Sequence, residues 1–152
     1  MAVSAGVPSL PSRPARWTPP PASLLGLVVL GGAVGTGVRY GLSTAFPAGY
    51  GEWPWAIWAI NMGGAFLLGF LLEALAATGP DAGWRRAARL GLGTGVLGGF
   101  TTYSTFTVET VELWQSGHVP QAVSYVGLSL IIGAGAALLG LWSGRGLAEA
   151  TR

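Results

Sequence analysis

Charged residues are spaced along the chain so that four long stretches contain none. The stretches hold 22 residues between Arg16 and Arg39, 20 between Glu52 and Glu73, 19 between Arg89 and Glu109, and 26 between His118 and Arg145. A helix needs about 20 apolar residues to cross the hydrocarbon core of a bilayer. Each stretch is therefore long enough to cross once, and the pattern predicts an all-α fold with four transmembrane helices.

Turn-forming residues set the expected limits of these helices. We expect helices near 23–42, 53–76, 86–113 and 119–143, within one membrane domain over 23–145. The connections are short and contain Gly and Pro, so consecutive helices should be antiparallel neighbours. The Pro-rich residues 1–22 are predicted to form a disordered tail, and residues 146–152 a C-terminal tail. A signal peptide is disfavoured because the apolar stretch is long and no small-x-small cleavage site follows.

The composition supports a membrane protein and excludes several kinds of function. Only 9% of the residues are charged, whereas soluble domains carry about a quarter, so a buried helix in a soluble α protein is the weaker reading. The net charge of +2, with no clustered basic stripe, does not indicate a nucleic-acid partner. There is no Cys and one His, and no acid–base pair or nucleophile set is visible, so we do not expect an enzyme.

Two polar features fall near the centres of uncharged stretches. Asn61 lies in the second, where its amide either holds two helices together or serves a pathway. Gly98-Gly99-Phe100-Thr101-Thr102 lies in the third and consists of poor helix formers. It is either a glycine-rich packing helix or an unwound segment, and unwound backbone at that depth must be buried in protein or line a cavity. We predict a break in the third helix here, whose free carbonyls would suit a cation.

Aromatic and hydroxyl side chains follow this segment. Tyr103 and Phe106 share a helix face, and their positive ring edges would suit an anion, although an ordinary aromatic contact has the same spacing. Tyr125 and Ser129 are four apart, which fits either a hydroxyl track or a helix–helix hydrogen bond. Glu109 is expected at the membrane interface or at the mouth of a pathway. No carboxylate or Lys lies inside a stretch, which favours a passive pathway over a proton-coupled pump.

The glycines and arginines indicate how the helices assemble and insert. Many of the 26 glycines are four residues apart, as in Gly31/Gly35 and Gly95/Gly99, a spacing that lets membrane helices approach closely. Four short helices do not easily enclose a hydrated pathway, so we expect a dimer. Seven of the eight arginines, all except Arg39, fall on the side of the two termini. This bias predicts that both termini are cytoplasmic.

Taken together, residues from about 24 to 145 resemble the Fluc/CrcB family of fluoride channels. The most specific likeness is Gly98-Gly99-Phe100-Thr101-Thr102-Tyr103-Ser104-Thr105-Phe106, followed by Glu109. Gly31-Gly32-x-x-Gly35 with Arg39, and Trp53-Pro54-Trp55 leading to Asn61, are also similar. The resemblance implies a fluoride-selective channel in the cell's inner (plasma) membrane that exports cytoplasmic fluoride passively.

The resemblance also implies an assembly and a set of site residues. The family forms antiparallel dimers with two fluoride pathways and a structural Na⁺ at the two-fold axis. The Na⁺ would be held by the main-chain carbonyls of Gly98 and Thr101. The implied pathway residues are Asn61, Tyr103, Ser104, Thr105, Phe106, Tyr125 and Ser129, with Arg39 and Glu109 as structural or vestibule residues.

Three features depart from the family pattern. Tyr103 stands where the family usually has Phe, and Gly133 and Ala137 stand where relatives can have Ser and Thr. The arginine bias is the third, because a chain that inserts in both orientations should have little bias. The partner is then either a second copy inserted with dual topology or an oppositely oriented paralogue in a heterodimer.

Two other functions are compatible with four small helices. A small multidrug exporter would need a membrane-embedded Glu, and the first uncharged stretch contains none. A non-transporting membrane scaffold would use the glycines and Asn61 for packing alone. Fluoride-selective efflux from liposomes distinguishes the channel from both.

Overall fold

The computed structural model describes residues 21–150, with side chains for 21–147, and all regular secondary structure in this range is helical. The elements in chain order are α1 (Ala22–Ala45), α2 (Trp55–Ala77), α3 (Gly83–Ala88), η1 (Arg89–Leu97), α4 (Gly98–Phe100), α5 (Tyr103–Gln115) and α6 (Val119–Ala150). We call residues 83–115, from α3 to α5, the third segment. The predicted tail over residues 1–22 lies outside the described residues except for its last two.

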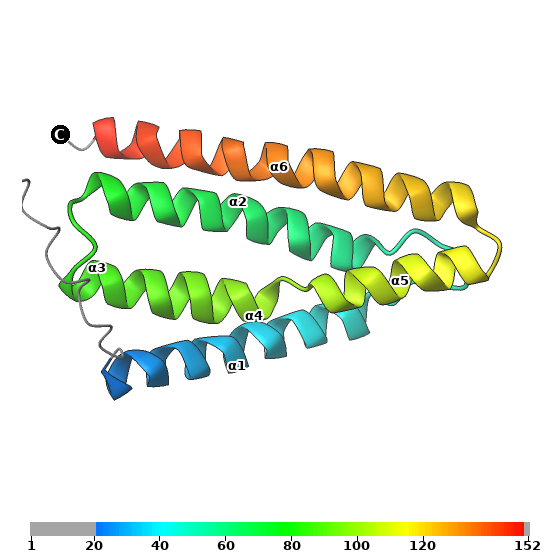
Figure 1. Cartoon of the computed structure of the whole chain (residues 1–152), viewed down its shortest axis with the longest axis horizontal. Coiled ribbons are helices and arrows are strands. Elements are labelled where there is room, and N and C mark those ends of the chain that lie inside the picture. The colour runs from blue at the N-terminus through cyan, green and yellow to red at the C-terminus, as the bar shows by residue number, and fades with distance from the viewer. Residues whose placement is uncertain (1–20, 151–152) are drawn as a thin grey trace, which may run out of the picture.

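The four long units run alternately up and down, but their neighbours differ from the sequence prediction. Figure 1 shows α6 beside α2, and α1 beside the third segment. α2 packs chiefly on α6, and α1 packs chiefly on η1 and α4, whereas α1 and α2 barely touch. The prediction that all consecutive helices are neighbours is therefore wrong. Helices α2 and α6 run parallel, because each is reached from the preceding one by a reversal of direction.

Glycine surfaces explain this choice of neighbours. A Cβ at Gly35 would overlap the carbonyl oxygen of Val96, and a Cβ at Gly99 would overlap that of Gly32. Between α2 and α6, a Cβ at Gly140 would overlap the carbonyl oxygen of Phe66. These backbones touch because no side chain separates them, which is how small residues bring membrane helices together.

Most predicted helix limits agree with the structure to within a turn. α1 continues to Ala45, where the hydroxyls of Ser43 and Thr44 donate to the Tyr40 carbonyl and remain inside the helix. α6 continues to Ala150, beyond the predicted end at 143 and into the predicted C-terminal tail. Arg145 donates to Glu73 of α2 at 2.8 Å, which anchors this added turn.

The break in the third segment is confirmed, but it lies two residues later than its glycines. Gly98, Gly99 and Phe100 are helical, and the extended residues are Thr101 and Thr102, with ψ of 155° and 128°. Before the break, η1 is a π-helix, a widened form that the sequence did not predict. The chain thus changes helical form over the residues that pack against α1, and then opens.

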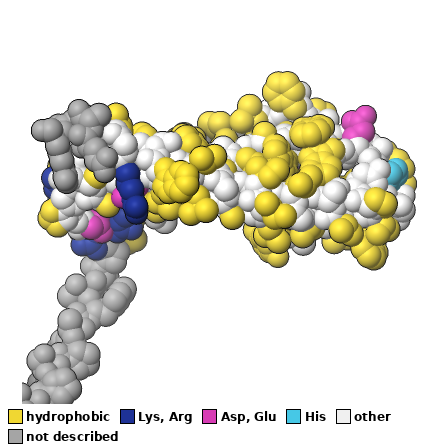
Figure 2. All heavy atoms as spheres, turned by 90° about the horizontal axis from the view of Figure 1, so that it is seen from above, with side chains coloured by type: hydrophobic (Ala, Val, Ile, Leu, Met, Phe, Trp, Pro, Cys, Tyr) yellow, Lys and Arg dark blue, Asp and Glu magenta, His cyan; other side chains and the backbone are white. Residues whose placement is uncertain are grey.

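Within the described residues most charged side chains lie toward the two ends of the molecule, and Arg39, which donates to Gly99 beside the break, is an exception. α1, α2 and α6 are long and apolar enough to cross a membrane. Figure 2 shows Arg side chains gathered at one end of the visible face and His118 at the other, with an apolar band between them. Arg85, Arg89 and Arg145 lie at the same end as the described termini, near Asp81 and Glu73. Arg13, Arg16 and Arg152 lie outside the described residues.

Candidate functional site

The break between α4 and α5 is organised by the side chain of Thr102. Thr102 is the N-cap of α5, and its hydroxyl accepts from the Thr105 amide at 3.2 Å. The same hydroxyl is 3.2 Å from the hydroxyl of Ser104 and donates to that of Thr105 at 3.2 Å. A β-branched hydroxyl residue at an N-cap satisfies a helix amide that would otherwise lack a partner. Three hydroxyls therefore cluster at the start of α5.

Asn61 of α2 holds the break from the other side. Its side-chain nitrogen donates to the Thr102 carbonyl at 3.0 Å, and its oxygen accepts from the Thr102 amide at 2.9 Å. The side chain of Asn61 therefore accepts from the amide that would donate to Gly98 in a continuous helix, and it adds a donor to the Thr102 carbonyl. The Asn61 side chain has two N–H groups, and one of them takes no part in these two hydrogen bonds.

These bonds leave particular carbonyls without their helical donors. In a continuous helix the Thr102 amide would donate to Gly98, and the Thr105 amide to Thr101. Those amides donate instead to Asn61 and to the Thr102 hydroxyl. The Gly99 carbonyl differs, because Arg39 of α1 donates to it at 3.2 Å and Thr36 donates at 3.4 Å. The break thus has carbonyls that accept from side chains of α1 and α2, and others that are released, among them those of Gly98 and Thr101.

The aromatic pair that follows the break lies on one surface of α5. The ring centroids of Tyr103 and Phe106 are 6.1 Å apart. The Tyr103 side chain is 80% exposed in the single chain, whereas Phe106 is half-buried. Phe106 also contacts Tyr125 of α6, with centroids 5.0 Å apart. One ring therefore belongs to the packed interior and the other is presented outward.

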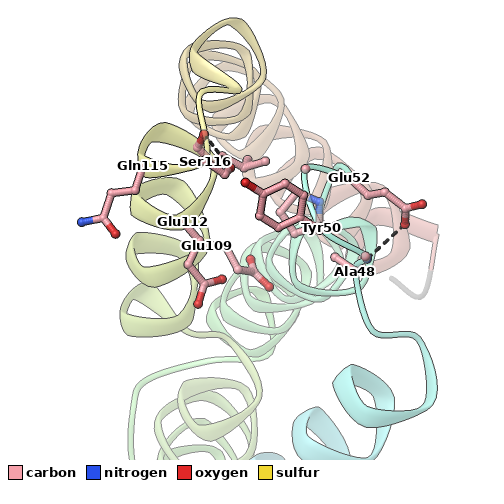
Figure 3. Close-up of a pocket in the computed structure, with 11 residues that line it drawn as sticks. Ala48, Tyr50, Glu52, Glu109, Glu112, Gln115 and Ser116 are labelled. Carbon is pink, nitrogen blue, oxygen red and sulfur yellow. Dashed lines mark hydrogen bonds between the residues drawn. The ribbon is translucent and has the colours of Figure 1, made fainter.

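Tyr125 is fully buried and joins α6 to α5 through a carboxylate. Its hydroxyl donates to Glu109 at 2.7 Å. Glu109 and Glu112 also line a pocket of about 480 Å³ at the end of the molecule opposite the arginines. Figure 3 shows both carboxylates beside Tyr50, whereas Glu52 points elsewhere and accepts from the Gly49 amide at 3.0 Å. Glu109 therefore lies between the Tyr125 cluster and an open mouth.

The structure brings most of the predicted site residues into two adjoining groups. Asn61, Ser104 and Thr105 meet at the break, and Phe106, Glu109 and Tyr125 meet beside it. Ser129 lies one helical turn beyond Tyr125, and Gly98 and Thr101 are among the residues with released carbonyls. Thr102 was missed as a side-chain participant, although a Thr directly before a helix start is a recognisable capping signal.

Comparison with known proteins places this arrangement in a family. The family described as "CrcB-like protein, Camphor Resistance (CrcB)" matches residues 26–141. A relative from Cutibacterium acnes named fluoride-specific ion channel FluC 1 is 49% identical over 111 residues, or 73% of this chain and 78% of the relative. FluC 2 from Leifsonia xyli is 49% identical over 115 residues, or 76% and 79% of the two chains. FluC from Hyphomonas neptunium is 40% identical over 123 residues, or 78% and 93%.

The matched region contains the break, both aromatic positions and every polar residue of the two groups. The match also covers the three apolar helices and the third segment between them. The resemblance seen in the sequence is therefore confirmed, and this multi-pass membrane protein belongs to the CrcB-like family.

Proposed function

We propose that this chain forms a fluoride-specific channel that lets cytoplasmic fluoride leave the cell down its electrochemical gradient. The relatives' names support the ion, and one observation supports the pathway. The observation is a hydroxyl and amide cluster at Thr102 within an otherwise apolar molecule, followed directly by two aromatic rings. An inside-negative potential assists export by about 2.3 kcal/mol per charge per 100 mV.

The donors around the break suit a small, strongly hydrated anion. Fluoride must exchange its water for hydrogen bonds, which the remaining Asn61 N–H and the hydroxyls of Ser104 and Thr105 can donate. The ring edges of Tyr103 and Phe106 add weaker electrostatic contacts. Tyr125 and Ser129 continue the polar surface along α6. The hydroxyl cluster accounts for selectivity through donor number, since chloride gains less from exchanging its water for these donors.

The test of transport is release from liposomes that contain the purified protein. The channel releases fluoride, followed with a fluoride electrode, and leaves ethidium gradients unchanged. A multidrug exporter would move ethidium instead, and a scaffold would move neither. Fluoride release equal to that of protein-free vesicles contradicts the proposal.

A dimer is part of the proposal because one chain leaves the pathway open on one side. Tyr103 is largely exposed, and Gly37 and Gly41 of α1 have no atom within 4 Å of an added Cβ. An antiparallel partner would cover these surfaces and complete the pathway. We further propose that the third segment, together with α1, α2 and α6, spans the inner (plasma) membrane.

The arginine bias supports a fixed orientation, with both termini in the cytoplasm. A chain of fixed orientation needs an oppositely oriented paralogue, so we favour a heterodimer over a homodimer of dual topology. Reporter fusions at the C terminus test this. Activity of a cytoplasmic reporter alone supports the heterodimer, whereas equal activity of cytoplasmic and periplasmic reporters contradicts it.

A structural Na⁺ fits the released carbonyls. Gly98 and Thr101 have lost helical donors to Asn61 and Thr102, and oxygen ligands of this kind suit a hard cation. Burying such carbonyls without partners in a membrane costs several kcal/mol, which a bound cation would offset. We expect the thermal unfolding midpoint of the purified protein to be higher in Na⁺ than in N-methyl-glucamine at equal ionic strength. Equal midpoints contradict the Na⁺ site.

A further inference from the structure

Three polar side-chain atoms are buried without a hydrogen-bond partner within the described residues. They are Nε1 of Trp53, Nε1 of Trp58 and Oγ of Ser129. All three belong to the surroundings of Tyr125. Trp53 meets the Tyr125 ring edge-on at 5.3 Å, Trp58 packs on the same cluster, and Ser129 lies one turn further along α6. A buried donor without a partner is costly, so a group of them calls for a ligand.

Trp58 and Ser129 lie at the same level on facing helices. On one side of this level, Trp53 contacts Tyr125. On the other side, a Cβ at Gly133 would be 3.3 Å from the Met62 methyl carbon. Because α2 and α6 run parallel, and Trp58 and Ser129 each precede Met62 and Gly133 by four residues, the two side chains occupy the level between these contacts.

The chemistry of the two side chains points to an acceptor. An indole N–H only donates, and a serine hydroxyl can donate as well. The structure has no hydrogen bond between them, so each of these buried groups is left with an unused donor. A charged acceptor gains more than a neutral one, since charge-assisted hydrogen bonds are stronger. Beyond this level, Gly133 and Ala137 offer α6 no further side-chain donor.

We propose that the Trp58 indole N–H and the Ser129 hydroxyl together bind fluoride, one turn beyond Tyr125. Trp58 is then a specificity-determining residue of the pathway. Its N–H comes from α2, at the level beyond which Gly133 and Ala137 of α6 carry no hydroxyl. The inference rests on the proposed fluoride channel, and it adds a donor that the polar pattern of the sequence did not reveal. Trp58 reads as an ordinary apolar position in the second uncharged stretch.

Indole proton resonances test this contact directly. The protein is labelled with ¹⁵N-tryptophan in detergent micelles and titrated with sodium fluoride, and with sodium chloride as a control. We expect the Trp58 indole proton to shift with fluoride but not with chloride, and the shift to fall in Ser129→Ala. The indole of Trp142, which is 69% exposed near the arginine end, serves as the internal reference and should not move.

Transport supplies the second readout. Trp58→Phe keeps the ring and removes the N–H, and should lower fluoride efflux from liposomes about tenfold, as expected for one lost hydrogen bond to an ion. The matched Trp142→Phe should retain the wild-type rate.

The outcomes separate this inference from the proposed function. A stationary Trp58 resonance in protein that transports fluoride overturns the inference and leaves the channel intact. An equal shift of the Trp58 resonance with chloride also overturns the inference. So does a reduced fluoride efflux in Trp58→Phe if the Trp58 resonance of the wild-type protein does not shift with fluoride. If vesicles that contain the wild-type protein release no fluoride, the proposed channel function and this inference are both contradicted.

Discussion

The two halves of the third segment are held in opposite ways. Before Thr101, η1 and α4 are held chiefly by shape, because glycine backbones of α1 and of the segment touch directly, and Arg39 and Thr36 of α1 add hydrogen bonds to the Gly99 carbonyl. After it, α5 begins in a group of side-chain hydrogen bonds from Thr102, Asn61 and neighbouring hydroxyls. The comparison teaches that backbone contact is the main support on one side of a break, whereas side-chain hydrogen bonds are the main support on the other. The polar half is where an anion can be bound.

Filling the glycine contact should have the largest effect. Gly35→Val puts a Cβ against the Val96 carbonyl oxygen and 2.8 Å from the Phe100 amide, and neither backbone atom can move aside. We expect a loss of about 3 kcal/mol in the free energy of unfolding, the upper range for overpacking. Thermal unfolding in detergent measures it.

Gly26→Val is the matched control, since no atom lies within 4 Å of an added Cβ there. Its midpoint should stay close to that of the wild type. Equal midpoints for the two variants would show that α1 is not held against η1 by backbone contact.

Removing the polar clamp should affect both stability and transport. Asn61→Ala leaves the Thr102 amide without its partner and removes a donor from the Thr102 carbonyl, which costs about 2 kcal/mol in the free energy of unfolding. Fluoride efflux should fall at least about tenfold, because an ion hydrogen bond is lost as well. Wild-type efflux and stability together would contradict the assigned role of Asn61.

The two aromatic positions should respond unequally. Phe106→Ala opens a space against Tyr125 and should lower fluoride efflux about tenfold, in line with about 1.4 kcal/mol. Tyr103→Phe keeps the ring edge, which is the part proposed to contact the anion, and should therefore change efflux less than about twofold. A large loss in Tyr103→Phe would instead give its hydroxyl a part in conduction.

The smallest effect is expected far from the break, at the ion pair of Asp81 with Arg89. The hydrogen bond from Arg89 lowers the pKa of Asp81 below its ordinary value of 3.8. A lowered pKa contributes stability above the ordinary value, and this stability is lost as the pH falls through the lowered one. Because the pair is exposed, Asp81→Asn should lower the unfolding midpoint only slightly at pH 7, with no difference in strong acid. A difference that grows as the pH falls would be of the wrong sign.

The sequence predicts much of the fold because each membrane helix corresponds to one continuous uncharged stretch of residues. Charge-free runs gave the helix limits, and Gly98 to Thr102 indicated a break. The glycines themselves stayed helical because α1 packs against them, and the two threonines opened because side chains can replace their backbone partners. The length of a helix depends on residues that are close in sequence. The opening at the two threonines depends on Asn61, which belongs to another helix.

Site geometry was less predictable for the same reason. Asn61 was expected near the middle of its helix, but its two hydrogen bonds to Thr102 join residues that are 41 positions apart in the sequence. The pairing of α2 with α6, which sets Trp58 opposite Ser129, likewise depends on which glycine surfaces meet. Tyr125 was identified by its hydroxyl, but its partner Glu109 lies on another helix, and the sequence predicted for Glu109 only a place at the membrane interface or at the mouth of a pathway.

The most direct measurement is the initial rate of fluoride and of chloride efflux from the same liposomes, for the wild type and for Asn61→Ala. Donors clustered at the break predict rapid fluoride release, negligible chloride release, and loss of the fluoride rate in the variant. Equal rates for the two anions, or a variant as fast as the wild type, would mean that the break is not where fluoride is recognised.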